Sequence, residues 1–315
     1  IYHHGLKANV KMKNAKGFDG NYTFCTDNHG FRYKCNNPIR GKNFDYAFIG
    51  DSFTEGSSVS YEDSFVGMFE KATNKKVANL GVVSYAPKIY LSKLNFFLEK
   101  GYTFEHVIIP IDISDLYDDD VSYRLKKNYI VEDNFERGEK LKIRRFLRKN
   151  FPFTNFYMFL IKNLNQVGYK PVNLENNKPS FHKNVLLKAK WTYSSDKFID
   201  GYWKPVQSAQ NEMIETMTKL YELLSKRNIP LSIVIYPWPQ QLENDNENSK
   251  HVQMWRLFCE NKCANFINLF PIFFKEKKDN GYLETYKKYY WWNDMHFNIE
   301  GNVLVAKEML KYFNK

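Results

Sequence analysis

The chain has 315 residues, of which 43% are hydrophobic and 17% aromatic, and its formal net charge is +11. This much apolar side chain can form a large core, which excludes a globally disordered protein. The charge favours anionic partners in general. The basic residues, however, follow neither a zinc-finger spacing nor an RNA-binding signature, so we expect no nucleic-acid partner.

The first stretch of the chain, residues 1–42, is polar and rich in Gly and Asn. This composition predicts an extended N-terminal arm with little helix, which packs on the core. Because the chain opens at Ile1 rather than Met, we expect that a signal peptide or a membrane anchor preceded it.

Four cysteines form two local pairs, Cys25 with Cys35 and Cys259 with Cys263. Neither pair has the His or Cys neighbours that a zinc site needs. Two alternatives are open for each pair: a short disulfide, or reduced and buried thiols. Disulfides would indicate an oxidising compartment.

From residue 43 onward, strand patterns alternate with helix patterns. Short apolar runs predict five buried strands, at 46–50, 77–81, 106–113, 231–236 and 266–269. Apolar residues at helical spacing predict four amphipathic helices, at 61–73, 89–100, 210–227 and 301–313. This order is typical of a doubly wound parallel α/β sheet, whose sites lie at the carboxyl ends of the strands.

Residues 117–190 interrupt this alternation, and we predict that they form an inserted, mainly helical subdomain between two parts of the α/β domain, 43–116 and 191–315. The acidic cluster Asp118 to Asp120 is expected to form a solvated face rather than a cation site. A basic and aromatic stretch at 140–164 predicts either a helix with one solvated face or a contact with a membrane surface.

A serine stands where the first predicted strand runs into a helix, in the sequence Phe48-Ile-Gly-Asp-Ser-Phe-Thr-Glu-Gly56. Such a turn exposes the serine hydroxyl at the top of the sheet and turns its backbone N–H toward a developing oxyanion. Ser52 is therefore a candidate nucleophile. The same three residues, Gly-Asp-Ser, also suit an ordinary turn or helix cap.

A carboxylate and an imidazole lie near the other end of the chain, in Trp292-Asn-Asp-Met-His-Phe-Asn-Ile-Glu-Gly301. A serine hydroxyl is a poor nucleophile until a base takes its proton, and the base needs a carboxylate to hold its tautomer. Asp294 and His296 can supply both groups from one loop. A capping pair before the last helix is the alternative.

Together, the two motifs resemble the SGNH/GDSL hydrolase superfamily over residues 44–120 and 230–313. The resemblance implies a flavodoxin-like three-layer α/β fold. It also implies a catalytic triad of Ser52, His296 and Asp294 that forms an acyl-enzyme, with no metal and no organic cofactor.

The resemblance further implies three donors to the oxyanion: the backbone of Ser52, the backbone of Gly81, and a side chain after the third strand. The superfamily usually has Gly-x-Asn-Asp at this third position, whereas this chain has Asp112-Ile-Ser114-Asp115, with Ser114 at the Asn position. A hydroxyl is shorter than an amide, and Asp112 adds an anion near the oxyanion. The oxyanion hole is therefore expected to be either rebuilt or weak.

A second departure is the spacing Asp-x-His, where most superfamily hydrolases have Asp-x-x-His; Asn293 stands where the usual Asp would be. The shorter spacing is similar to the alginate O-acetyltransferase branch, whose members modify exopolysaccharides outside the cytoplasm. We expect a serine esterase acting on acyl esters, with acetyl as the expected group, of a carbohydrate or surface glycan. The alternatives are a polysaccharide O-acetyltransferase with the same triad and a non-catalytic glycan-binding protein of the same fold.

Two further side chains, Trp238 and Gln240, follow the predicted strand at 231–236 on the active-site end. We expect them either to line a sugar site or to belong to a rigid, proline-fixed loop. The expected partners are an acylated glycan and a membrane-bound acyl donor. The expected location is extracytoplasmic, in the periplasm or at the cell surface.

Overall fold

A computed structural model of the chain describes residues 2–35, 39–126, 130–133 and 178–313. The basic stretch at 140–164, with its predicted membrane contact, lies outside the described residues, as does most of the predicted helical insertion. In the described part of the chain, none of the helices combines the length and the apolar character that a bilayer span requires.

The centre of the molecule is a sheet of five parallel strands in the order β10-β9-β6-β4-β5. Their bounds are β4 Asn43–Phe48, β5 Val77–Asn79, β6 Thr103–Ile111, β9 Leu231–Ile235 and β10 Asn265–Asn268. The first strand of this sheet along the chain is β4. The next, β5, pairs with one side of β4, and β6, β9 and β10 follow on the other side. The strand order therefore reverses between β4 and β6, which is where flavodoxin-like sheets bind their ligands.

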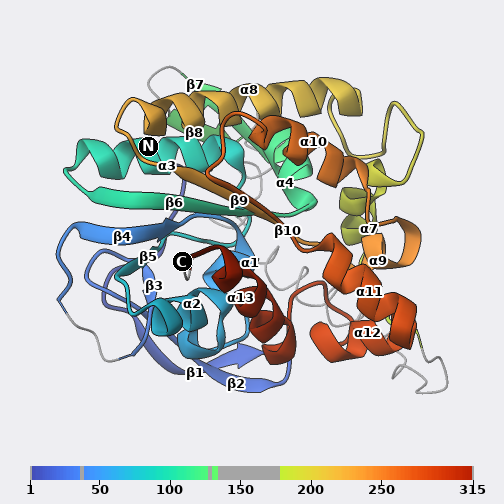
Figure 1. Ribbon diagram of the computed structural model, residues 1–315, viewed down its shortest axis with the longest axis horizontal. Coiled ribbons are helices and arrows are strands. Elements are labelled where there is room, and N and C mark those ends of the chain that lie inside the picture. The colour runs from blue at the N-terminus through green and yellow to red at the C-terminus, as the bar shows by residue number, and fades with distance from the viewer. Residues whose placement is uncertain (1, 36–38, 127–129, 134–177, 314–315) are drawn as a thin grey trace, which may run out of the picture.

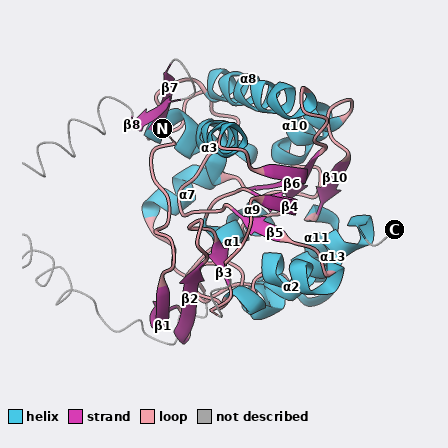
Figure 2. Cartoon of the chain, turned by 90° about the vertical axis from the view of Figure 1, so that its left-hand side faces the viewer, coloured by secondary structure: helices cyan, strands magenta, loops and turns pink. Residues whose placement is uncertain are grey.

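Helices cover both faces of this sheet and complete a three-layer α/β fold (Figures 1 and 2). One face carries α3 (Pro87–Glu99), α8 (Val206–Ser225) and α10 (Lys250–Cys259). The other carries α2 (Phe65–Thr73), α11 (Phe270–Asn280), α12 (Tyr282–Tyr289) and α13 (Ile299–Phe313). Because both faces are covered, β5 and β9 are buried along their whole lengths, including the polar Asn79 and Ser232. The predicted fold class is confirmed.

The N-terminal arm is more regular than its polar sequence predicts. Strands β1 (Lys11–Gly17), β2 (Gly20–Thr26) and β3 (Arg32–Tyr33) form a separate antiparallel sheet. The tight turn between β1 and β2 depends on Gly20, whose φ of 94° lies in the left-handed region that favours glycine.

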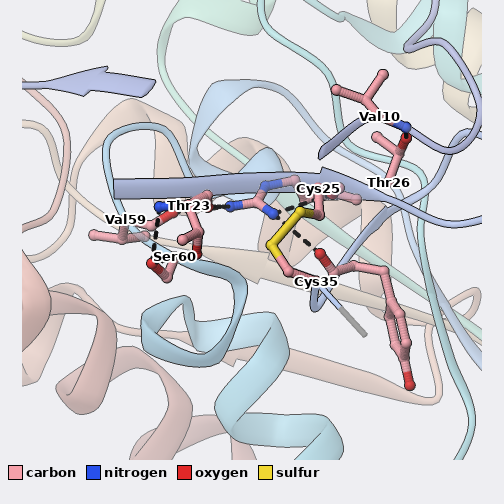
Figure 3. Close-up of a disulfide and its surroundings, with 9 residues drawn as sticks. Val10, Thr23, Cys25, Thr26, Cys35, Val59 and Ser60 are labelled. Carbon is pink, nitrogen blue, oxygen red and sulfur yellow. Dashed lines mark hydrogen bonds between the residues drawn. A yellow bond between two sulfur atoms is a disulfide. The ribbon is translucent and has the colours of Figure 1, made fainter. Parts of the chain in front are cut away.

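Both cysteine pairs form disulfides. The Cα atoms are 5.2 Å apart in Cys25–Cys35 and 4.7 Å apart in Cys259–Cys263, within the range that a bridge spans. The first bridge ties β2 to the segment after β3 (Figure 3), and the second joins the last residue of α10 to the turn that follows it. Of the two alternatives left open by the sequence, the structure has the disulfides.

The described ends of the predicted insertion contain strands as well as helices. The elements are α4 (Ser114–Tyr117), the π-helical turn η2 (Asp118–Ser122), the antiparallel pair β7 (Tyr123–Lys126) and β8 (Ile130–Asp133), and α7 (Lys183–Ala189). The short elements elsewhere are α1 (Ser52–Glu55), η1 (Tyr61–Asp63), η4 (Lys190–Thr192) and α9 (Pro239–Asn244).

The acidic cluster in η2 was predicted to form a solvated face. This prediction is wrong, because Asp118, Asp119 and Asp120 are all buried. Each carboxylate meets a lysine ammonium from another element. The pairs are Lys188 with Asp118 at 2.6 Å, Lys88 with Asp119 at 3.4 Å, and Lys204 with Asp120 at 3.5 Å. Burial is tolerated here because every acid has a cationic partner.

Candidate active site

Ser52 lies in the turn that connects β4 to α1, at the carboxyl end of the sheet. Only glycine fits at position 50 of this turn, since a Cβ there would lie 2.9 Å from the carbonyl oxygen of Pro110 and closer still to the side chain of Thr54. Asp51 then caps α1, its carboxylate accepting the backbone N–H of Phe53 at 3.0 Å. The tight approach to β6 and the cap together fix Ser52 as the first residue of the helix.

The loop before α13 is held by its own hydrogen bonds. A β-bridge pairs Tyr290 with Phe297, and the backbone N–H of Trp291 donates to the carbonyl of His296 at 3.0 Å. The backbone N–H of Asp294 donates to a tyrosine hydroxyl of α12 at 3.1 Å. Asp294 and His296 are therefore presented by a closed loop anchored to its neighbouring helix.

The structure brings together the three side chains that the two motifs supply. Nε2 of His296 is 2.7 Å from Oγ of Ser52, and Nδ1 of His296 is 2.5 Å from Oδ1 of Asp294. The same carboxylate oxygen accepts the backbone N–H of His296 at 2.8 Å. With the Nδ1 proton on the carboxylate side, Nε2 is left to accept the serine proton, which is the arrangement of a serine nucleophile and its base.

The other two predicted oxyanion donors are already engaged. The backbone N–H of Gly81 donates to Oδ1 of Asn79 at 3.0 Å, and a Cβ on Gly81 would lie 2.7 Å from the backbone of α1. Ser114 donates both its backbone N–H and its hydroxyl to Oδ1 of Asp112, at 2.7 and 2.8 Å. Gly81 thus packs the loop after β5 against α1, and Ser114 caps a turn. The backbone N–H of Ser52 is the predicted donor that remains.

Three carboxyl groups, from Asp51, Asp112 and Asp115, form a buried cluster next to the nucleophile. Asp51 lies 3.3 Å from the Ser52 hydroxyl, which can donate to it. Burial raises the pKa of Asp51 well above its usual range, and the neighbouring carboxylates of Asp112 and Asp115 raise it further. Burial, followed by the charge of Asp112, also raises the pKa of Asp115. Asp51 and Asp115 therefore retain protons at pH values where ordinary carboxyl groups have lost theirs.

Nothing in the sequence pattern marked this cluster, because burial of a carboxyl group follows from packing. The described residues contain no group of three or more His, Cys, Asp or Glu side chains arranged to hold a metal ion.

Trp238 and Gln240 do not form the predicted sugar-binding surface. Trp238 is only 3% exposed; its ring stacks on Phe53, and its indole N–H donates to Asp112 at 3.0 Å. Gln240, in α9, is 1% exposed. Both side chains are turned inward in the proline-fixed segment after β9, and Trp238 donates a hydrogen bond to the carboxylate cluster.

Phe18 is a residue of the site that the sequence did not reveal. It lies at the tip of the β1–β2 hairpin, and its ring centroid is 5.9 Å from that of His296, with 22° between the ring planes. Its ring is 49% exposed. The only sequence signal is an aromatic residue within the turn Gly-Phe-Asp-Gly, and this signal does not say against which surface the hairpin packs.

A small hollow lies beside the nucleophile. Its volume is about 10 Å³, room for roughly one water molecule. It is lined by Ser52, Phe53, Gly56, Ser57, His296, Phe297 and Asn302. A group reaching Ser52 through this hollow has to be small.

No family model and no curated protein matches the chain. Among solved structures, the chain is similar to a lipolytic protein of the G-D-S-L family from Desulfitobacterium hafniense, with 12% identity and a TM-score of 0.43 over 86% of this chain and 99% of that one. It is also similar to an acetylxylan esterase from Geobacillus stearothermophilus, with 12% identity and a TM-score of 0.42 over 86% and 94%.

A third similar structure is a psychrotrophic esterase from Pseudoalteromonas sp., with 13% identity and a TM-score of 0.39 over 87% of this chain and 97% of that one. At these TM-scores, the chemistry of the site has to be judged from this chain's own side chains. The solved structures to which the chain is similar include G-D-S-L family lipolytic proteins and esterases.

Proposed function

We propose that this protein is a serine ester hydrolase whose catalytic residues are Ser52, His296 and Asp294. The observation that carries the proposal is the unbroken line of hydrogen bonds from the Ser52 hydroxyl through both imidazole nitrogens to the Asp294 carboxylate, at 2.7 and 2.5 Å. Ser52 is 8% exposed, at the edge of a hollow, so substrate can approach while most water is excluded.

In the proposed reaction, Oγ of Ser52 attacks the ester carbonyl carbon while Nε2 of His296 takes the hydroxyl proton. The negative charge on the carbonyl oxygen is met by the backbone N–H of Ser52. When the tetrahedral intermediate collapses, the bond to the alcohol oxygen breaks and His296 returns the proton to that oxygen. Asp294 stabilises the imidazolium that exists between these steps. The acyl-serine ester is then cleaved by an alcohol or water that His296 deprotonates.

The size of the hollow supports a short acyl group, with acetyl as the group we propose. A hollow of about 10 Å³, room for roughly one water molecule, matches a small group such as a methyl better than a long chain. The resemblance to the SGNH/GDSL superfamily supports a carbohydrate ester as the substrate. The two disulfides support an extracytoplasmic location, because disulfides persist where the surroundings are oxidising.

The test is hydrolysis of p-nitrophenyl acetate by the wild-type protein and by Ser52→Ala. We expect kcat/KM of the variant to fall by about 10⁴-fold or more, because both the nucleophile and the covalent step are lost. Ser208→Ala is the matched control, since it removes an exposed serine hydroxyl from α8, outside the hollow and the hydrogen-bonded line. Equal rates for the wild type and Ser52→Ala would reject the proposal in favour of a non-catalytic glycan-binding protein.

A second candidate function is transfer of the acyl group to a polysaccharide hydroxyl, with a membrane-bound donor as partner. The observation that favours it is the Asp294-x-His296 spacing. At this short spacing, Asp294 still accepts hydrogen bonds from both the backbone N–H and Nδ1 of His296. Incubation with p-nitrophenyl acetate and an unacetylated oligosaccharide, followed by mass spectrometry, separates the two functions. Acetylated sugar supports transfer, and free acetate alone supports hydrolysis.

A further inference from the structure

The tip of the N-terminal hairpin reaches the proposed catalytic imidazole. Phe18 stacks over His296, and the same ring is 6.5 Å from the ring of Trp291. Half of the Phe18 surface is nevertheless in solvent. An aromatic ring that packs only partly at the edge of an active site leaves its remaining surface free for another molecule.

The hairpin that carries Phe18 is docked firmly on the loop after α1. The guanidinium of Arg32 is fully buried and donates to the carbonyl oxygens of Thr23 and Val59, both at 3.0 Å. The hydroxyl of Thr23 donates to that of Ser60 at 2.9 Å, as Figure 3 shows. The Cys25–Cys35 disulfide lies beside these contacts (Figure 3). A ring at the tip of so well anchored a hairpin has a defined position relative to Ser52.

The proposed chemistry determines which part of a substrate would meet this ring. The leaving alcohol takes its proton from Nε2 of His296, so the alcohol part of the ester must lie against the imidazole during the reaction. The acyl part has the small hollow beside Ser52. Next to His296, the ring of Phe18 offers a surface that is both apolar and exposed.

We propose that Phe18 forms one wall of a subsite for the sugar ring that carries the ester, and so contributes to substrate specificity. This inference rests on the proposed ester hydrolysis. A sugar ring suits the site because its C–H face can pack on an aromatic ring while its hydroxyl groups stay in water. The Phe18 ring is about half exposed, so a group that packs on it keeps one side in water, which suits a sugar ring better than a long apolar alcohol.

The test compares two acetate esters with the same acyl group: fully acetylated methyl glucoside, which has a sugar ring, and vinyl acetate, which has no ring. For Phe18→Ala, we expect KM for the sugar acetate to rise by about 5- to 10-fold, the size of one lost aromatic contact, with kcat little changed. For vinyl acetate, we expect both constants to stay within about twofold of wild type, because this ester does not reach the ring. Phe18→Trp should retain the wild-type KM for the sugar acetate.

Met12→Ala is the matched control, because Met12 lies on the same hairpin at the other end of β1 and is 48% exposed. Equal losses on both esters in Phe18→Ala would mean that Phe18 positions the imidazole, and no loss on either would mean that it has no role; both results overturn the subsite. Binding of the sugar acetate to Ser52→Ala, measured by ligand-observed NMR, tests the subsite even if the wild-type protein hydrolyses neither ester. In that case the proposed function fails, while weaker binding in the Phe18→Ala/Ser52→Ala double variant would still support the subsite.

Discussion

Two polar groupings meet at the carboxyl ends of β4 and β6, and they differ in almost every physical respect. The upper grouping, Ser52 with His296 and Asp294, is partly open to solvent, and its members are joined in a line by short hydrogen bonds. The lower grouping, Asp51 with Asp112 and Asp115, is buried and consists of like charges.

The comparison teaches that position at the end of a strand does not by itself mean contact with substrate. Two residues expected to contact substrate or oxyanion, Ser114 and Trp238, donate their hydrogen bonds to Asp112 in the lower grouping. These two donors thus form hydrogen bonds with a buried carboxyl group, which would be costly to bury without such partners. The proposed chemistry therefore involves the upper grouping alone, and the lower one supports the turn that carries Ser52.

Among the variants that distinguish the two groupings, Asp294→Asn is expected to have the largest effect, a loss of kcat. The amide is neutral, so it cannot stabilise the charged imidazole as the carboxylate does, and its NH₂ group can donate to Nδ1 and hold the wrong tautomer. We expect kcat to fall by about 10³- to 10⁴-fold, while the free energy of unfolding changes by less than about 1 kcal/mol. Steady-state kinetics and urea denaturation measure the two quantities. A variant that stays within tenfold of the wild-type kcat would show that Asp294 is a loop cap.

The fold class and the upper grouping could be predicted from sequence because each depends on local patterns. Apolar runs indicate the buried strands, and Gly-Asp-Ser and Asp-x-His are short motifs that the strand order then brings to one edge of the sheet. The lower grouping and Phe18 could not be predicted. Whether Asp112 is buried, and against which loop a hairpin tip lies, are decided by packing between segments far apart in the chain. The same reason explains why Asp119 was expected in solvent but lies buried against Lys88.

An intermediate effect, on stability rather than rate, is expected for Asp112→Asn. The pKa of Asp51 is raised in the folded protein by burial, by Asp112 and by Asp115. A raised carboxyl pKa stabilises the folded state at acid pH, and this contribution is lost as pH rises through the folded-state pKa. Removing the Asp112 charge brings the pKa of Asp51 closer to its ordinary value, so less stability is lost on going to neutral pH.

We therefore expect the unfolding free energy to fall less with rising pH in Asp112→Asn than in the wild type. Urea denaturation at a series of pH values measures it. Asp200→Asn, at an exposed carboxyl group, is the control and should leave the pH dependence unchanged. The titratable groups that face the cluster from the surrounding elements include Tyr90, Asp118, Lys188 and Tyr236, and they are the same in both proteins. If both variants showed the wild-type pH dependence, the cluster would not share its protons as inferred.

The smallest effect is expected for Tyr90→Phe, which touches only the lower grouping. The hydroxyl of Tyr90, on α3, donates to Oδ1 of Asp115 at 2.5 Å, and both groups are buried. Removing the hydroxyl leaves a buried carboxyl oxygen without this donor, and a lost hydrogen bond of this kind costs about 1–2 kcal/mol of unfolding free energy. Tyr46→Phe removes a hydroxyl from a less buried ring on β4 and is the matched control, with an expected change below about 0.5 kcal/mol.

The kinetic result for Tyr90→Phe decides whether the two groupings are independent. If the lower grouping only supports the turn, kcat/KM should stay within about twofold of wild type although stability falls. A loss of tenfold or more would mean that the protonation of Asp115 reaches Ser52 through Asp112 and Asp51, so the two groupings would act as one. Comparing the stability and the rate in this single variant therefore tests the separation, because the removed hydroxyl bonds to Asp115 and not to any side chain of the upper grouping.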